Sequence, residues 1–211
     1  MMITSYNFDT MGDVLVAILA ESAANSAVEI NGDVTRIFDA DTNETTGYNF
    51  FGLGDKLDLR TAKGQVFLDD NQVSVLNAVL GNAGFSDVLV ANPSKLVIGF
   101  VESMMPHPDS DHLNVTTTRV AADQTLQIVS GSPNMQPGIK VVVAQPGTLM
   151  PSGQQIWAGA LRGVPSAGMI VSGRELKLPG APDVPGALIL PVDFGEVGDA
   201  FDFVKGATLF A

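Results

Sequence analysis

Cysteine is absent from the 211-residue sequence. This absence excludes disulfide bonds, thiolate catalysis and cysteine-ligated metals, and it makes a cytoplasmic location the default expectation. The sequence also lacks an uncharged apolar run near the roughly 20 residues that a membrane helix needs, so we expect no membrane-spanning segment. Asp9 and Asp13 stand where a secretory signal carries lysine or arginine. Residues 14–20 are therefore interpreted as a strand buried on both faces rather than as an export signal.

Basic residues are scarce: 11 lysines and arginines stand against 23 acidic residues, and the formal net charge is −12. The imbalance lies mainly in residues 1–90, which hold thirteen acids and four bases. Residues 97–190 hold six acids and five bases and are nearly neutral. This asymmetry predicts two modules. A chain this acidic repels nucleic acid as a whole, so any RNA binding requires local compensation.

Motifs for enzyme chemistry are missing from the sequence. It has no Gly-x-Ser-x-Gly nucleophile elbow and no Gly-Lys-Ser/Thr phosphate loop. We therefore expect neither an enzyme nor a cofactor. The densest polar cluster runs from His107 to His112 and includes two aspartates, which are residue types that bind divalent metals. Because Pro106 and Pro108 force a turn there, a structural loop is the favoured interpretation and no metal ligand is assigned.

The first 90 residues have the pattern of an α+β domain. Residues 34–39 and 48–51 have strand composition, and they flank a polar cluster at 41–44 that predicts a hairpin turn. A helix is expected to follow, with Asp70 as its N-cap and Gly81 as its C-cap. Its apolar face is Val73, Leu76, Val79 and Leu80. Turn-forming residues at 91–94 mark the predicted domain boundary.

Short apolar or alternating segments dominate the second half of the chain. They are residues 96–101, 113–120, 126–129, 139–144, 156–161 and 188–190. Short strands separated by glycine-rich and proline-rich turns indicate a small all-β barrel or sandwich over residues 91–200. No helix of convincing length is expected there, and residues 201–211 are expected to form a C-terminal tail.

Two glycine-framed loops in this half are candidates for a binding surface. The stretch LRGVPSAGM at 161–169 combines a base, a hydroxyl and a methionine, and SGSPN at 130–134 adds a polar loop. Loops at one end of a small barrel commonly bind ligands. The residues alone favour equally the alternative that Gly163 and Gly168 simply allow tight turns.

Five motifs together resemble the tRNA-binding domain found at the N-terminus of the phenylalanyl-tRNA synthetase β chain and at the C-terminus of many methionyl-tRNA synthetases. They are HPDSDHL (107–113), IVSGSPN (128–134), GIKVVVA (138–144), LRGVPSAGM (161–169) and SGREL (172–176). With its acidic front module, the chain resembles the small stand-alone bacterial tRNA-binding proteins of the YtpR type. The resemblance implies an all-β OB-fold barrel that holds tRNA by its shape and backbone, without catalysis.

By motif position, the resemblance also implies which residues face RNA. They are Asn134, Arg162, Ser166 and Met169, with Lys140 and Arg174 as the nearest bases. Three of them have a structural alternative: Asn134 caps its own turn, Lys140 is solvated beside buried valines, and Met169 packs inside the barrel. Glu175 is expected to bond a backbone loop or to pair with a neighbouring base.

His112 stands where the family commonly has a lysine, and an ordinary histidine is mostly uncharged at neutral pH. With only five bases in the barrel region, the sequence predicts weak, salt-sensitive RNA binding. The main rival function is a protein-interaction or chaperone module on the same OB-fold, similar to the CsaA type, with no RNA binding. Stand-alone relatives of the barrel often dimerise, so the sequence leaves two alternatives open: a homodimer, or a front domain that takes the place of the second subunit. The acidic front domain is a candidate docking site for a protein partner.

Overall fold

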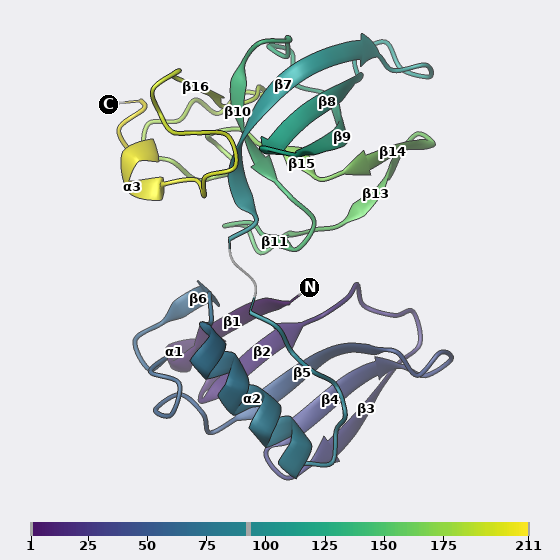
Figure 1. Ribbon diagram of the computed structural model, residues 1–211, viewed down its shortest axis with the longest axis vertical. Helices are drawn as coiled ribbons and strands as arrows, with labels where there is room; N and C mark the ends of the chain where they lie inside the picture. Colours follow the sequence, from purple (N-terminus) through teal and green to yellow (C-terminus); the bar gives the residue numbers. More distant parts are fainter. Residues whose placement is uncertain (1, 92–93, 211) are drawn as a thin grey trace. The chain divides into compact units, whose positions relative to one another are not determined.

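The computed structural model describes residues 2–91 and 94–210, and it divides the chain into two compact units, Met1–Pro93 (unit 1) and Ser94–Ala211 (unit 2) (Figure 1). Both units are mostly β, with few helices. The boundary predicted at residues 91–94 includes residues 92 and 93, which lie outside the described residues. Within the described ranges, no helix is long and apolar enough to cross a membrane.

Unit 1 is built on one six-stranded antiparallel sheet with the spatial order β3-β4-β5-β2-β1-β6. Along the chain the strands are β1 (Ile3–Asn7), β2 (Val14–Ile18), β3 (Ser26–Asn31), β4 (Val34–Asp39), β5 (Thr45–Phe51) and β6 (Lys63–Val66). The one-turn helix α1 (Phe8–Met11) connects β1 to β2. Strands β4 and β5 form the hairpin that the polar cluster at 41–44 predicts.

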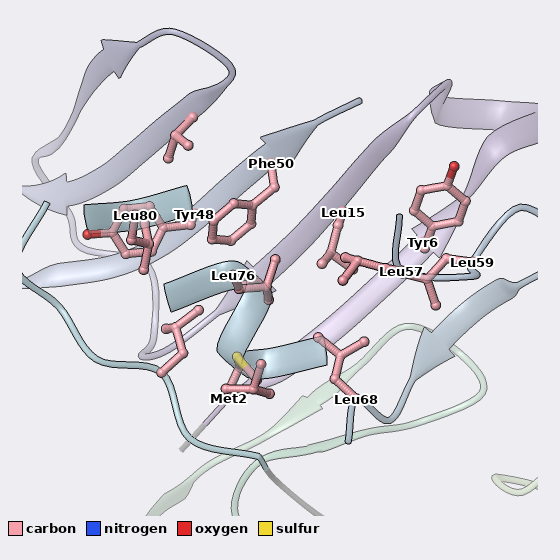
Figure 2. Packing of buried hydrophobic residues seen from close by; sticks show 14 residues of the cluster. Met2, Tyr6, Leu15, Tyr48, Phe50, Leu57, Leu59, Leu68, Leu76 and Leu80 are labelled. Carbon is pink, nitrogen blue, oxygen red and sulfur yellow. The ribbon is translucent and has the colours of Figure 1, made fainter. Parts of the chain in front are cut away.

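Helix α2 (Asp70–Asn82) covers one face of this sheet (Figure 1). Its buried residues are Val73, Leu76 and Leu80, which recur at the spacing of one helix face, as the sequence predicts. Figure 2 shows leucines of this face beside Tyr48 and Phe50, two fully buried aromatic residues of β5. The apolar contact between α2 and the sheet therefore forms the core of unit 1.

The two ends of α2 differ from the expected caps. Asp69, rather than Asp70, is the N-cap: its carboxylate accepts from the Gln72 backbone N–H at 2.8 Å. In return, the Gln72 side-chain oxygen accepts from the Asp69 backbone N–H at 3.0 Å, which completes a capping box. If Asp70 were the N-cap, Val73 would occupy position N3. A valine side chain has no acceptor for the N-cap backbone N–H, so no capping box could form. At the other end Gly81 lies inside the helix, and the residue with positive φ is Gly84, at +81°.

Strand β2 shows why the expectation of burial on both faces is wrong for residues 14–20. Leu15 and Ala17 are buried, whereas Val14, Val16 and Ile18 are half-buried. Successive side chains of a strand point to opposite faces, and the core cluster that includes α2 takes only Leu15 and Ala17 from this strand. The strand itself is confirmed over Val14–Ile18.

Unit 2 contains a six-stranded antiparallel sheet in which β15-β10-β7-β8-β9 are consecutive and β16 also pairs with β10. These strands are β7 (Leu96–Pro106), β8 (Asn114–Ala121), β9 (Gln124–Ser130), β10 (Lys140–Ala144), β15 (Met169–Ile170) and β16 (Ile189–Leu190). Two small hairpins join β11 (Thr148–Leu149) to β12 (Gln155–Ile156) and β13 (Ala158–Leu161) to β14 (Val164–Ala167). The predicted strands are confirmed, except that residues 156–161 are divided between β12 and β13.

Strand β10 is the strand that is buried on both faces. Val142 and Ala144 belong to one core cluster, and Val141 and Val143 belong to another. All four residues have no exposed surface. The run of three valines and an alanine therefore lies between two apolar clusters, which explains why it shows no polar alternation.

The last residues of the chain pack onto unit 2. The Phe201 ring stacks on Phe194 with 5.5 Å between ring centroids, and Phe201 is buried. The one-turn helix α3 (Phe203–Gly206) follows, with Asp202 as its N-cap. The Phe210 ring packs against Gly173, where an added Cβ would lie only 2.8 Å from two ring carbons. These contacts make residues 201–210 a folded part of unit 2, in place of the expected tail.

Candidate nucleic-acid interface

The loop at 107–113 is joined to the β13–β14 hairpin through His107. Its side chain is buried, with 3% of its surface exposed. The backbone N–H of Asp109 donates to His107 Nδ1 at 3.0 Å, so Nε2 carries the ring proton and donates to the Leu161 carbonyl at 3.0 Å. His107 therefore fixes the end of β13 relative to the loop, immediately before Arg162.

Arg162 and Gly163 form the two-residue turn between β13 and β14. Both have positive φ, +45° and +81°, which are typical of a type I′ hairpin turn. Asparagine is the usual first residue of such a turn, and arginine lacks its tolerance for this conformation. The exposed Arg162 side chain donates from Nη1 to the Asp109 carbonyl at 2.9 Å. Because this acceptor is a carbonyl and not a carboxylate, the positive charge of Arg162 is not neutralised by it.

Asn134 joins the loop at 130–134 to a distant segment. Its side-chain amide donates to the Ala187 carbonyl at 2.9 Å, and its side-chain oxygen accepts from the Ala187 N–H at 2.8 Å. The Asn134 side chain therefore makes two hydrogen bonds to the backbone of Ala187. These bonds do not cap the turn in which Asn134 lies. The residue as a whole is exposed.

Ser166 is buried, with 5% of its surface exposed. Its hydroxyl oxygen accepts from the Val129 N–H at 3.1 Å and donates to the Gly168 carbonyl at 3.2 Å. Nearby, the Gln127 side chain donates to the Pro165 carbonyl at 2.7 Å. These contacts attach β14 to β9. The hydroxyl proton is therefore engaged inside the protein, and we assign Ser166 a positioning role instead of a place on the surface.

Lys140 is also engaged within unit 2. Its Nζ donates to the carbonyls of Val192 and Gly195, both at 2.6 Å. The ammonium group therefore holds the chain that follows β16, and it is neither simply solvated nor directed at the β13–β14 turn.

Met169 and Arg174 line one shallow cavity of about 230 Å³. Residues 130–132 and Gly186 also line this cavity. Arg174 Nη1 donates to the exposed Asp183 carboxylate at 3.0 Å. Met169 is half-buried and also packs against a core cluster. The alternative that Met169 packs inside the protein is therefore correct for part of its side chain.

Glu175 secures the backbone on which Arg174 lies. Its carboxylate accepts from both the backbone N–H and the hydroxyl of Ser172, each at 2.7 Å. The Ser172 hydroxyl in turn accepts from the Glu175 N–H at 3.1 Å. Glu175 was expected either to bond a backbone loop or to pair with a neighbouring base, and the structure shows the bond to the backbone.

The six expected residues lie in different places. Met169 and Arg174 share the cavity described above, and Asn134 lines an adjoining cavity of about 260 Å³ that has Ser172 and Gly186 in common with it. Arg162 lies on the β13–β14 turn, while Ser166 and Lys140 are bonded within the fold. The residue that sequence reasoning missed is His107, which the motif HPDSDHL contains but whose bond to residue 161 only the tertiary structure reveals.

His112, by contrast, is exposed and pairs with Asp111 through Nδ1 at 3.1 Å. This contact lowers the pKa of the Asp111 carboxyl below its ordinary value. In the part of the chain that the structure describes, no three histidine, aspartate or glutamate side chains gather to hold a metal ion. The loop at 107–112 is organised around the buried ring of His107.

Comparison with known proteins defines the class of unit 2 first. Residues 96–195 match the family described as "Putative tRNA binding domain", and residues 21–92 match a domain of unknown function (DUF4479). The β subunits of phenylalanine–tRNA ligase from Cupriavidus pinatubonensis and Oceanobacillus iheyensis are 45% and 51% identical over 111 and 83 residues. Those matches cover 49% and 39% of this chain but only 13% and 10% of the ligase subunits.

A relative of the same length then identifies the family. "Putative tRNA-binding protein YtpR" of Bacillus subtilis is 44% identical over 200 residues, which are 94% of this chain and 98% of that protein. The chain therefore belongs to the YtpR family of stand-alone tRNA-binding proteins, as the motifs predict. It belongs with these binding proteins and not with the enzymes that carry the same domain.

Proposed function

We propose that unit 2 binds tRNA without catalysis, through the β13–β14 turn and the cavity beside it. The observation that carries this proposal is the placement of Arg162. An arginine occupies a turn position better suited to asparagine, and two bonds through His107 and Asp109 hold that turn in place. A cation on an exposed, braced hairpin suits contact with a phosphate of a folded RNA.

We also propose that unit 2 forms an OB-fold barrel. The sheet runs from β15 to β9, and β14, which directly precedes β15, is bonded to β9 through Ser166 and Gln127. The two ends of the sheet are therefore connected by side-chain bonds, which supports a curled, barrel-like arrangement. In such a fold the loops at one end commonly form the nucleic-acid site.

The binding test is fluorescence anisotropy of labelled bulk tRNA at low and near-physiological salt, with an unstructured RNA of similar length as the control. We expect tighter binding to tRNA. Arg162→Glu should weaken binding at least about tenfold, because a phosphate contact becomes a repulsion. Arg162→Asn removes the charge but suits the turn, so it should weaken binding without loss of thermal stability.

The matched control is Lys56→Glu, which changes the charge equally at an exposed position of unit 1. If Arg162→Glu and Lys56→Glu weaken binding to the same extent, the effect reflects net charge and the proposed surface is wrong. If the parent protein does not bind tRNA at low salt, the proposed function itself is wrong.

The acidity of the chain favours a second candidate function. A net charge of −12 suits a protein-binding or chaperone-like module similar to the CsaA type better than it suits RNA. That function predicts binding to unfolded client proteins with an affinity that salt leaves unchanged, whereas tRNA binding weakens with salt.

In either case we propose a cytoplasmic protein, because a cysteine-free chain fits a reducing compartment. We also keep a homodimer, and docking of a protein partner on the acidic unit 1, as proposals.

A further inference from the structure

Two cavities of unit 2 adjoin each other. The first, of about 230 Å³, is the cavity that Arg174 lines. The second, of about 260 Å³, shares Ser172, Pro185 and Gly186 with the first. We call the second one the neutral cavity. The described residues that line it are all uncharged, and they include Asn134, Pro182, Val184 and Phe210.

Phe210 contributes an aromatic wall to the neutral cavity. Its ring packs on Gly173, where an added Cβ would lie only 2.8 Å from two ring carbons. The residue is half-buried, so the ring also offers surface to the cavity. Phe210 lies beyond residue 195, where the match to the tRNA-binding family ends. This wall therefore comes from outside the segment that the family describes.

The segment 182–186 contributes a second wall. Pro182 and Pro185 have a fixed φ, which limits the conformations that this segment can adopt. Between them, Val184 is 57% exposed. A wall that is already restricted loses little conformational freedom when a ligand binds. The neutral cavity is therefore suited to hold a ligand between an aromatic ring and an apolar, restricted segment.

Asn134 supplies polar groups to the neutral cavity. A primary amide has two hydrogens to donate and two lone pairs to accept with. Ala187 uses one hydrogen and one lone pair, so one of each is left for a ligand. An added Cβ at Gly186, which lines both cavities, would lie 3.3 Å from Asn134 Oδ1. The amide therefore lies beside the part that the two cavities share.

The lining of the neutral cavity indicates the chemistry of its ligand. A charged group would lose its hydration there without gaining a counter-charge. An unpaired nucleobase is flat and uncharged, stacks on aromatic rings and forms hydrogen bonds along its edges. The volume of about 260 Å³ is just below the roughly 300 Å³ at which pockets for drug-sized ligands begin. A single ring system therefore suits it better than a longer segment of chain.

The first cavity favours a nucleobase over an apolar side chain of a protein. Arg174 is exposed and pairs with Asp183, whose carboxylate is 89% exposed, so solvent screens this pair. Ser132 adds a hydroxyl to the same lining. Glu175 also lines this cavity, but its Oε2 already accepts two hydrogen bonds from Ser172. A cation beside a neutral cavity matches the phosphate beside a base, whereas an apolar side chain brings no anion.

We propose that the neutral cavity binds an unpaired nucleobase of tRNA, packed against Phe210 and hydrogen-bonded by Asn134, while Arg174 contacts the phosphate of the same nucleotide. The inference rests on the proposed function of unit 2 and adds to it the part of the RNA that is held. It also makes the last residues of the chain part of the binding surface.

Anisotropy of labelled tRNA tests the cavity with two matched variants. Val184→Glu places a carboxylate in the lining and should weaken binding about tenfold or more, because it repels the phosphate and removes an apolar contact of the base. Val192→Glu makes the same charge change at an 86% exposed valine of unit 2 that is not among the lining residues. Its affinity should stay within about twofold of the parent.

Phe210→Leu tests the aromatic wall without adding charge. Leucine retains apolar packing on Gly173 but cannot stack on a base, so tRNA binding should weaken about fivefold. Thermal unfolding of the same preparation shows that the variant is folded at the temperature of the titration. A folded Phe210→Leu variant with the affinity of the parent overturns the proposal.

Nuclear magnetic resonance of the full chain tests the ligand chemistry without tRNA. The four nucleoside 5′-monophosphates, titrated into the millimolar range, should shift the side-chain amide resonances of Asn134. Ribose 5-phosphate, which has no base, should leave these resonances in place. N-acetyl-phenylalanine amide is the probe for an apolar side chain. Shifts with this probe and none with the nucleotides assign the cavity to protein binding and overturn the proposal.

The outcomes separate this inference from the proposed function. If the parent does not bind tRNA, the proposed function is wrong and the nucleobase site is wrong with it. If the parent binds tRNA and the two glutamate variants weaken binding equally, only the nucleobase site is wrong. Equal shifts of the Asn134 amide with ribose 5-phosphate and with the nucleotides also overturn the nucleobase site alone.

Discussion

At the scale of single residues, unit 2 places an exposed cation, Arg162, on a turn and supports that turn with a buried histidine. The ring of His107 uses both nitrogens, one toward its own loop and one toward residue 161. Loss of the ring would leave the Leu161 carbonyl and the Asp109 N–H without these partners. The position of Arg162 therefore depends on a buried side chain of the neighbouring loop.

His107→Ala should lower the free energy of unfolding by about 2 kcal/mol, because two hydrogen bonds and buried surface are lost. The same variant should weaken tRNA binding at a temperature where the protein remains folded. Urea unfolding and tRNA anisotropy on one preparation would measure both effects. A variant with reduced stability but the tRNA affinity of the parent would show that the hydrogen bonds of His107 do not position Arg162 for binding.

The two tyrosines of the chain both lie in the core of unit 1, and burial raises the pKa of each phenol above its ordinary value. Tyr48 also donates a 2.5 Å hydrogen bond to Asp87, which raises its pKa further. The folded state therefore retains protons that the unfolded state releases above about pH 10.

Stability should accordingly be fully present below about pH 10 and fall as the pH rises beyond it, by about 1.4 kcal/mol per pH unit for each tyrosine. Urea unfolding of the parent and of Tyr48→Phe across the alkaline range would test this. The variant should show a shallower decline. An equally steep decline in both proteins would assign the alkaline loss to other groups.

Some of these residue roles could be predicted from the sequence and others could not. The motifs place Arg162 and Asn134 in loops, and the structure finds both of them there. The burial of Ser166 and the bonds of Lys140 depend on Val129 and on residues 192–195, which are far away in sequence. Local pattern carries no information about such partners.

At the scale of elements, the capping box of α2 offers a sharp comparison between adjacent aspartates. Asp69→Ala removes the acceptor for the Gln72 N–H and should lower the free energy of unfolding by about 1 kcal/mol. Asp70→Ala removes only a charge near the helix N-terminus and should cost about 0.5 kcal/mol or less. Chemical unfolding of the two variants would measure both free energies of unfolding. A larger loss of unfolding free energy for Asp70→Ala than for Asp69→Ala would contradict the observed N-cap.

Strands were predictable where their apolar residues are continuous or regularly spaced. Residues 34–39 and 139–144 correspond closely to β4 and β10 because local composition and burial agree. The edge strands β3 and β6 escaped prediction, as did β1 inside the sheet, because polar residues or glycine interrupt their apolar runs. Burial on one face or on both depends on what packs above the strand, which a single strand sequence does not reveal.

At the scale of the whole molecule, the affinity for tRNA should fall as the salt concentration rises. With about two phosphate contacts, the logarithm of the tRNA association constant should fall by about 1.8 for each tenfold rise in salt. Titrations at several salt concentrations would give this slope, and Arg162→Asn should reduce it by about 0.9. A slope near zero would favour the protein-binding function.

The contact between Phe210 and Gly173 has a consequence for shortened forms of unit 2. The turn that carries Arg174 packs against the aromatic ring of Phe210. Removal of the residues after 200 should therefore leave this turn without its support, and Arg174 should lose its fixed position although it is distant in sequence from the deleted segment.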